Sequence, residues 1–315
     1  MKNDINQPAV PDPRELLSIC IPTYNRAPLL KELLEAISRE MERVPVLAAE
    51  IGVYICDNAS TDNTGDVVRQ VAVRIPGLCY TRNETNVGAE ANVLHVRELA
   101  AGYYSWVLGD DEILHEGSLE IVAKILRTKA HGLILLFDSF YDARFSRPVE
   151  FANYADCVRF CIKRNPHALV EHTLISSNIY RSDCFDFDVV RQFMGMYYPH
   201  MYGMIRPLIR NRLSVYIPAA PVIAVRQFDR PYSDGGSHPP VDEAWQTYLT
   251  WLRDELELPE LDPMAPSRIA RRQMFVKMLR HPLMFLWRNR GAFFAPSAYR
   301  HLFMRVFLPS RTLEK

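Results

Sequence analysis

The sequence predicts an α/β fold, with a mostly parallel central sheet flanked by helices and a helical basic extension at the C-terminus. Short apolar runs alternate with amphipathic helical stretches four times from residue 16 onward, an order typical of parallel sheets. The runs are almost continuously apolar, as expected for strands that are buried on both faces. Each run ends in polar residues, which places polar side chains along one edge of the sheet.

These patterns predict the elements and the division of the chain. Strand character is found at residues 16–21, 51–56, 78–81, 103–108, 132–137 and 174–181. Apolar residues at helical spacing predict helices at residues 29–41, 67–71, 91–101, from 118 onward, 158–162, from 197 onward and 245–252. We expect a disordered leader at 1–14, an α/β domain at 15–228, a loop or linker at 229–240 and a C-terminal region at 241–315.

The composition argues against several classes of protein. Lysine and arginine balance aspartate and glutamate at 37 each, so no global field favours nucleic acid. The six cysteines lie mostly inside apolar runs without C-x-x-C spacing, which predicts buried free thiols in a reducing compartment. The sequence shows neither a signal-peptide core nor an apolar stretch long enough to cross a membrane, so we expect a cytoplasmic protein.

Four strand ends carry the polar residues that we expect to form one composite site. They are Thr23, Asn25 and Arg26 after the first strand, Asp57 and Asn58 after the second, Arg82 and Asn86 after the third, and Asp110, Asp111 and Glu112 after the fourth. Each set taken alone is also compatible with a solvated loop. Together, basic and acidic groups at one sheet edge suit a phosphorylated ligand bridged by a metal.

Three consecutive acids follow Gly109 directly after an apolar strand. This arrangement is costly because like charges repel and a partly buried carboxylate resists ionisation. A divalent cation would relieve both costs, and oxygen donors suit Mg²⁺ or Mn²⁺. The alternative is a solvated acidic turn before the helix that starts near Ser118.

Two common nucleotide-binding motifs are missing, G-x-G-x-x-G after the first strand and G-x-x-x-x-G-K-[ST], which disfavours a Rossmann dinucleotide site and a P-loop. Four segments in this order, residues 18–26, 57–62, 86–88 and 109–112, resemble family-2 inverting glycosyltransferases with the GT-A fold. The resemblance covers residues 16–140 well and 170–228 more loosely. It departs from the family at Gly109, where the common form has Asp, so Asp110-Asp111-Glu112 corresponds to a shifted D-x-E form.

The resemblance implies a site for a nucleotide-sugar donor. Its residues are Pro22, Thr23, Tyr24, Asn25, Arg26, Asp57, Asn58, Arg82, Asn86, Gly88 and Asp110. Thr23 and Arg26 would contact the base, ribose or phosphate, and Asp57 would hydrogen-bond the base. The acids Asp110, Asp111 and Glu112 would hold Mg²⁺ or Mn²⁺ on the diphosphate, with Asp111 as the central ligand.

Sugar transfer passes through an oxocarbenium-like transition state, and a metal and an arginine stabilise the departing nucleoside diphosphate. A base must also deprotonate the acceptor hydroxyl. Many family members carry a Glu-Asp pair for this step; it is missing here, and His200 stands near its place as the candidate base. The alternative is that His200 only shapes the acceptor pocket near Ser177 and Asn178. Asp186 and Asp188 are weaker candidates, better suited to a helix N-terminus.

From Ser267 onward, basic residues are interleaved with large apolar and aromatic ones, and Glu314 is the only acid. This pattern suits a helix on an anionic membrane surface, at the inner face of the cell membrane. The alternative is a helical cap packed on the catalytic domain. Membrane attachment would fit a lipid-linked acceptor, such as a saccharide on an undecaprenyl carrier.

The leading hypothesis is therefore a hexosyl- or deoxyhexosyltransferase in lipopolysaccharide O-antigen or other surface polysaccharide biosynthesis. The second hypothesis is a sugar nucleotidyltransferase. Resemblance to that class would require a Gly-rich loop with Arg or Lys after the first strand, and this chain has Pro22-Thr23-Tyr24-Asn25 there instead. The third hypothesis is a non-catalytic nucleotide-sugar-binding or scaffold subunit. The acidic cluster argues against it, and the missing Glu-Asp pair argues for it.

Overall fold

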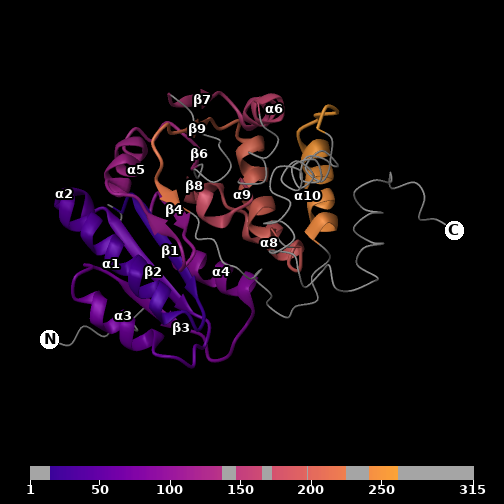
Figure 1. Ribbon diagram of the computed structural model, residues 1–315. Helices are drawn as coiled ribbons and strands as arrows, with labels where there is room; N and C mark the ends of the chain where they lie inside the picture. The colour runs from indigo at the N-terminus through magenta and orange to yellow at the C-terminus, as the bar shows by residue number, and fades with distance from the viewer. Residues whose placement is uncertain (1–14, 137–146, 165–171, 197, 225–240, 262–315) are drawn as a thin grey trace, which may run out of the picture. The chain divides into compact units, whose positions relative to one another are not determined.

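The computed structural model describes residues 15–136, 147–164, 172–196, 198–224 and 241–261 (Figure 1). The strands are β1 (Leu17–Thr23), β2 (Ile51–Asp57), β3 (Cys79–Arg82), β4 (Tyr104–Val107), β5 (Ile113–Leu114), β6 (Leu133–Leu135), β7 (Val149–Phe151), β8 (Asn178–Arg181), β9 (Val215–Ile217) and β10 (Ile223–Ala224). The helices are α1 (Ala27–Arg43), α2 (Pro45–Ala48), α3 (Thr64–Ala72), α4 (Ala89–Glu98), α5 (Ser118–Leu126), α6 (Tyr154–Arg164), α8 (Phe187–Gln192), α9 (Pro199–Arg210) and α10 (Val241–Glu255).

The main sheet has eight strands in the order β3-β2-β1-β4-β8-β6-β9-β7. The part formed by β3, β2, β1 and β4 is parallel, as the sequence predicted. β8 runs antiparallel between β4 and β6, β7 runs antiparallel to β9, and β5 pairs with β10 in a small second sheet. The register sets Thr23 beside Asp57 and Asp57 beside Arg82, so three predicted site residues share one edge.

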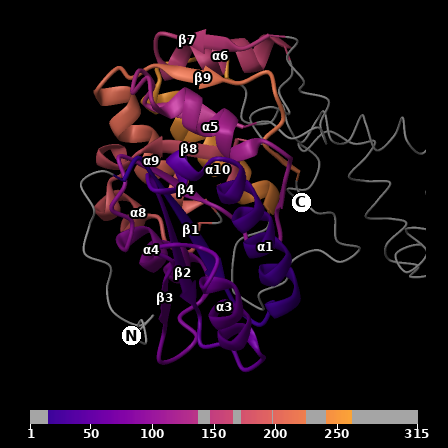
Figure 2. The same cartoon turned by 90° about the vertical axis from the view of Figure 1, so that its left-hand side faces the viewer.

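Alternate side chains of the central strands pack into two different layers. Ile19 and Ile21 of β1 pack in a core with α1, α3 and α5, whereas Cys20 packs with Val96 of α4. Figure 2 shows α1 and α4 on opposite sides of these strands. The predicted amphipathic stripe of α1 is buried against the sheet, at Leu30, Leu33, Leu34 and Ile37. Burial of each such side chain contributes about 1.5–3 kcal/mol. The predicted α/β class is confirmed.

A second core joins α6, α9 and α10. Tyr248, Leu249 and Leu252 of α10 are fully buried in it. The chain divides into compact units after Leu261, so α10 belongs to the same unit as the sheet, although the sequence pattern placed residues 241–315 in a separate region. The basic tail at 262–315, the leader at 1–14 and the linker at 229–240 lie outside the described residues.

Strands β5, β7, β9 and β10 were not expected from the sequence, and one expected strand is shorter than predicted. The strand expected at 174–181 begins only at Asn178, because Ile175–Ser177 forms a 3-10 turn closed by a 3.0 Å bond from the Ser177 amide to the Leu174 carbonyl. All six cysteines are buried free thiols. In the part of the chain that the structure describes, no helix combines the length and apolar character needed to cross a bilayer.

Candidate functional site

The loop after β1 and the acidic loop after β4 meet at the carboxyl edge of the sheet, because β1 and β4 are neighbouring parallel strands. Thr23 Oγ1 donates a hydrogen bond of 2.8 Å to Asp110 Oδ2. Arg26 Nη1 lies 3.0 Å from Asp110 Oδ1 and 3.0 Å from Asp111 Oδ2. The first and fourth predicted sets therefore converge, as expected from the order of the strands.

Asp110 is buried, and burial raises the pKa of its carboxyl to about 6. Loss of water penalises the charged form. The guanidinium of Arg26 and the hydroxyl of Thr23 lower the pKa, while the neighbouring charge of Asp111 raises it. The carboxyl therefore titrates close to physiological pH, a property typical of functional sites.

Asp57 ends β2 and is held by three polar groups. Tyr80 Oη donates to Asp57 Oδ2 at 2.6 Å, and the Ser60 amide donates to Asp57 Oδ1 at 2.8 Å. Arg82 Nε lies 3.6 Å from Asp57 Oδ2. Burial and the bond to Asp57 raise the pKa of Tyr80, which keeps the phenol protonated as a donor. We call Thr23, Arg26, Asp57, Arg82, Asp110 and Asp111 the carboxyl-edge cluster.

Asn25 fixes the loop between β1 and α1. Its φ of 51° lies in the left-handed region, which Asn tolerates better than most residues. Its Oδ1 accepts from the Thr61 amide at 2.7 Å and from the Asp62 amide at 3.3 Å, and its own amide donates to Ser60 Oγ at 2.9 Å. Asp62 Oδ2 in turn accepts from the Ala27 amide at 3.0 Å. The loops after β1 and β2 are thereby locked together.

Asn58, Asn86 and Gly88 form the other side of the edge. Asn58 Nδ2 donates to Asn86 Oδ1 at 2.7 Å and to the Gly88 carbonyl at 3.3 Å, and its Oδ1 accepts from the Val87 amide at 2.9 Å. Gly88 has a φ of +88° at the N-terminus of α4, a conformation that favours glycine. These residues hold the loop between β3 and α4, while Tyr24, expected in the same site, is exposed.

The oxygens of Asp110 and Asp111 converge on one cationic atom, and carboxylate oxygens are the donors that a hard divalent cation prefers. Glu112 is buried, and its amide donates to the Gly109 carbonyl at 3.3 Å. Among the described residues, no three His, Cys, Asp or Glu side chains are grouped so that they could hold a metal ion. Of the three acids expected to hold a metal, Asp110 and Asp111 share one cationic partner.

His200 lies in the first turn of α9, and its side chain is close enough to the buried His172 to affect the pKa of that imidazole. Burial lowers the pKa of His200 to about 4, and a hydrogen bond with the Thr173 backbone acts in the opposite direction. Burial and the nearby His200 lower the pKa of His172 to about 3. Both imidazoles are neutral near pH 7. A neutral imidazole can accept a proton, but its lowered pKa makes it a weaker base.

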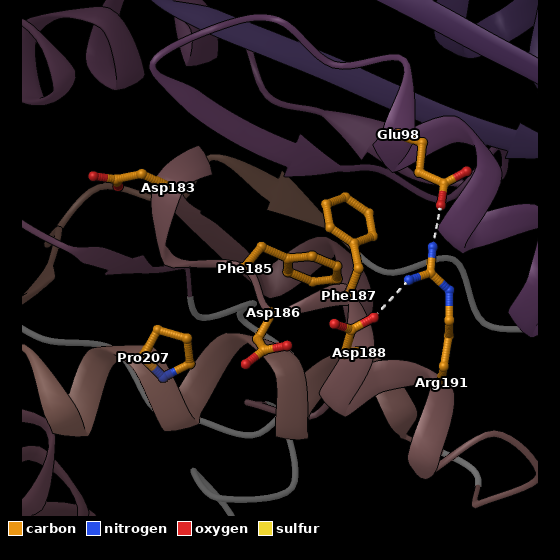
Figure 3. A pocket seen from close by; sticks show the side chains of 8 residues that line it. All are labelled: Glu98, Asp183, Phe185, Asp186, Phe187, Asp188, Arg191 and Pro207. Carbon is orange, nitrogen blue, oxygen red and sulfur yellow. Dashed lines mark hydrogen bonds and ion pairs between the residues drawn. The ribbon is translucent and has the colours of Figure 1, made fainter.

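Asp186 and Asp188 line a separate cavity of about 530 Å³ that contains no member of the carboxyl-edge cluster (Figure 3). Asp186 Oδ1 accepts from the Val189 amide at 3.0 Å and caps α8. Asp188 Oδ1 accepts from Arg191 Nη1 at 3.0 Å. Both acids therefore have the role of helix N-terminal charges.

The sequence model of glycosyl transferase family 2 matches residues 18–171, which contain the whole carboxyl-edge cluster. These residues form a family 2 glycosyltransferase domain. The chain is 28% identical over 214 residues to the abequosyltransferase RfbV of Salmonella typhimurium, with 60% of each protein covered. It is 28% identical over 122 residues to an uncharacterized glycosyltransferase of Mycoplasma genitalium, covering 38% of this chain and 40% of that protein.

Solved structures support the same architecture for the family 2 domain. The structure of S. aureus TarS 1-349 in complex with UDP-GlcNAc superposes with a TM-score of 0.54 at 15% identity, covering 92% of this chain and 81% of that one. A second structure of S. aureus TarS also gives a TM-score of 0.54 and covers 44% of that chain. At this level of identity the likeness shows the fold, which is the GT-A fold expected from the sequence.

The sequence did not reveal two residues next to the carboxyl-edge cluster. Tyr80 is two positions before Arg82 in β3, and this alternation could have placed both side chains on one face. Ser176 Oγ accepts from the Gly109 amide at 3.0 Å, and its carbonyl accepts from Trp106 Nε1 at 2.8 Å. No local pattern could have predicted these bonds, since Ser176 lies far along the chain from both partners.

Proposed function

We propose that this protein is a glycosyltransferase that moves a hexosyl or deoxyhexosyl group, with inversion, from a nucleotide-sugar donor to a saccharide acceptor. The observation that carries the proposal is the convergence of Thr23, Arg26, Asp110 and Asp111 within a family 2 domain. The similarity to an abequosyltransferase supports a role in lipopolysaccharide O-antigen or related surface polysaccharide biosynthesis.

In this proposal the carboxyl-edge cluster holds the two ends of the donor nucleotide. Asp57, fixed by Tyr80 and Ser60, offers a rigid buried acceptor for the base. Arg82 is half exposed beside it and can reach the ribose or a phosphate. The binding of UDP-GlcNAc by the structurally similar TarS 1-349 is consistent with a nucleotide-sugar site on this fold.

The residues present fit a divalent metal on the diphosphate. Mg²⁺ sites commonly use one or two carboxylates together with substrate phosphates rather than a cage made by the protein alone. Asp110 and Asp111 supply two carboxylates, which agrees with the lack of a three-ligand group among the described residues. When bound, Mg²⁺ or Mn²⁺ would neutralise charge that develops on the leaving diphosphate.

The acceptor oxygen attacks the anomeric carbon while the bond from that carbon to the diphosphate oxygen breaks, and a base takes the acceptor proton. His200 is our candidate for this base. It is neutral, and its Nε2 is buried without a hydrogen-bond partner among the described residues, so it is able to accept a proton. Ser177 and Asn178 are also buried, and we propose that they shape the acceptor pocket.

The test is thermal unfolding with UDP, GDP, dTDP and CDP, each with and without Mn²⁺, followed by consumption of the corresponding nucleotide sugars. A ligand specific to the folded state raises the unfolding midpoint by mass action. We expect one nucleotide to act only with Mn²⁺, and Asp111→Asn to abolish this effect. Asp188→Asn, an exposed acid outside the carboxyl-edge cluster, is the matched control and should leave the effect intact. Failure of all four nucleotides at millimolar concentration would refute the donor site.

A non-catalytic nucleotide-sugar-binding subunit is the second candidate, and the lowered pKa of His200 favours it because a weak base slows acceptor deprotonation. Nucleotide binding without consumption of any nucleotide sugar would support this candidate over the enzyme.

We also propose that the basic region from Ser267 onward attaches the protein to the inner face of the cell membrane, where a lipid-linked acceptor such as an undecaprenyl-linked saccharide would be presented. The support is the interleaving of basic and apolar residues in the sequence. Co-sedimentation with phosphatidylglycerol vesicles, but not with phosphatidylcholine vesicles, is expected. Equal recovery with both would count against the proposal.

A further inference from the structure

One cationic atom contacts two of the three acids of the carboxyl-edge cluster, Asp110 and Asp111. Arg26 Nη1 is 3.0 Å from Asp110 Oδ1 and 3.0 Å from Asp111 Oδ2. The side chain of Asp110 is 5% exposed, that of Asp111 23%, and that of Arg26 30%. Two carboxylates on neighbouring residues, one of them deeply buried, are thus neutralised in part by an arginine from a different loop.

We propose that Arg26 is an internal counter-ion for the metal-binding acids, which releases them when a divalent metal and a diphosphate enter and then binds the diphosphate itself. The inference rests on the proposed function, since it concerns the same metal and donor site. It assigns Arg26 a positioning role that couples the two ligands, in addition to contacting the donor.

Charge is the first reason. A divalent cation on Asp110 and Asp111 would lie within a few ångströms of the guanidinium if Arg26 stayed in place, and like charges at this distance repel strongly in a partly buried site. The metal alone must therefore displace the arginine from both carboxylates. This displacement weakens the binding of metal in the absence of other ligands.

The hydrogen-bond arrangement is the second reason, because a metal can replace Arg26 while the Asp110 carboxyl keeps its orientation. Asp110 uses different oxygens for its two partners: Oδ2 accepts from Thr23, and Oδ1 accepts from Arg26. When Arg26 leaves, Thr23 still orients the carboxyl. Arg26 itself lies just before α1, with non-helical backbone angles and a partly exposed side chain, so a rotamer change does not disturb the helix.

A diphosphate provides the new partner. Its oxygens accept from a guanidinium in the same bidentate geometry as a carboxylate does. Arg26 then stabilises the diphosphate while the metal takes the acids. The consequence is positive coupling: each ligand removes part of the cost of binding the other, by the same factor in both directions.

The experiment measures Mn²⁺ binding to the full chain by electron paramagnetic resonance of free Mn²⁺, without nucleotide. Arg26→Gln removes the counter-ion and is expected to tighten Mn²⁺ binding by about fivefold or more, the lower end of typical coupling factors. Arg82→Gln removes an equal charge from the same edge, where Arg82 contacts Asp57 and Ser60, and should change the affinity by less than about twofold. With inorganic pyrophosphate present, corrected for the Mn²⁺–pyrophosphate complex in buffer, the gain in Mn²⁺ affinity should be smaller in Arg26→Gln than in the wild type.

Three results separate this inference from the proposed function. If Asp111→Asn abolishes Mn²⁺ binding but wild type and Arg26→Gln bind Mn²⁺ equally, the counter-ion role is refuted and the metal site stands. If neither wild type nor Arg26→Gln binds Mn²⁺, both the inference and the metal part of the proposed function fail. If Arg26→Gln does not fold, the NMR signal of the Arg26 Nε–H group in the wild type is measured instead, and its loss in Arg26→Lys assigns it. A shift of this signal on addition of Mg²⁺ supports displacement of Arg26. An unchanged signal refutes it.

Discussion

Replacement of Asp110 by asparagine should stabilise the protein at alkaline pH. The pKa of Asp110 is raised from 3.8 to about 6 because the carboxyl is buried, so its charged form destabilises the folded state. The raised pKa stabilises the folded state in full at pH values below the unfolded-state pKa near 3.8. This stabilisation is lost as the pH rises through the folded-state pKa of about 6. A shift of about two units corresponds to about 3 kcal/mol in the free energy of unfolding. Asparagine mimics the neutral form and avoids this loss.

Urea unfolding of both proteins from about pH 4 to pH 8 measures the effect. The Asp110→Asn variant should match the wild type near pH 4 and exceed it by up to about 3 kcal/mol at pH 8, while losing Mn²⁺-dependent nucleotide binding. Asp188→Asn is the control: its side chain is exposed and paired with Arg191, so its effect should stay within about 0.5 kcal/mol at every pH. A difference between Asp110→Asn and the wild type that does not grow with pH would refute the electrostatic reasoning.

Three further predictions concern the carboxyl-edge cluster, its neighbour Tyr80 and the candidate base His200. Thr23→Val removes a hydrogen-bond donor to the Asp110 carboxylate, so the pKa of Asp110 should rise by about one unit. Stabilisation by Mn²⁺ should then require a correspondingly higher pH, which a series of thermal-shift measurements at different pH values tests. Tyr80→Phe deletes the 2.6 Å bond to Asp57 and should cost about 1–3 kcal/mol in urea unfolding and weaken nucleotide binding; unchanged nucleotide affinity would place the base-binding group elsewhere. His200→Ala should lower the rate of sugar transfer by about 100-fold or more with nucleotide affinity unchanged, and a rate near that of the wild type would exclude His200 as the base.

The sequence alone was sufficient to predict the parallel half of the sheet and the polar residues at its carboxyl edge. Buried strands alternating with amphipathic helices define β1, β2, β3 and β4, and polar residues at their ends converge because parallel strands finish at the same edge. The strand order alone therefore predicts that Thr23 and Arg26 lie near Asp110 and Asp111 and that Asp57 lies near Arg82, as the structure shows.

Other features depended on contacts between distant parts of the chain. Periodicity gives the face of a strand but not its partner, so the antiparallel insertion of β8 between β4 and β6 could not be predicted. The burial that lowers the pKa of His200 comes from packing around α9 and is likewise invisible in a local pattern. Composition separated α10 from the domain, whereas its apolar face packs into the second core.

The position of β8 also affects how the chain folds while it is being synthesised. β4 pairs with β1 on one side and with β8 on the other, and Trp106 of β4 donates to Ser176 across 70 residues. Until Asn178–Arg181 has been synthesised, β4 is an open sheet edge, a surface that promotes association between chains. A fragment ending at residue 171, where the family 2 match stops, would retain the carboxyl-edge cluster but keep this edge permanently open. The segment that matches the family model is thus shorter than the segment needed to cover both edges of β4.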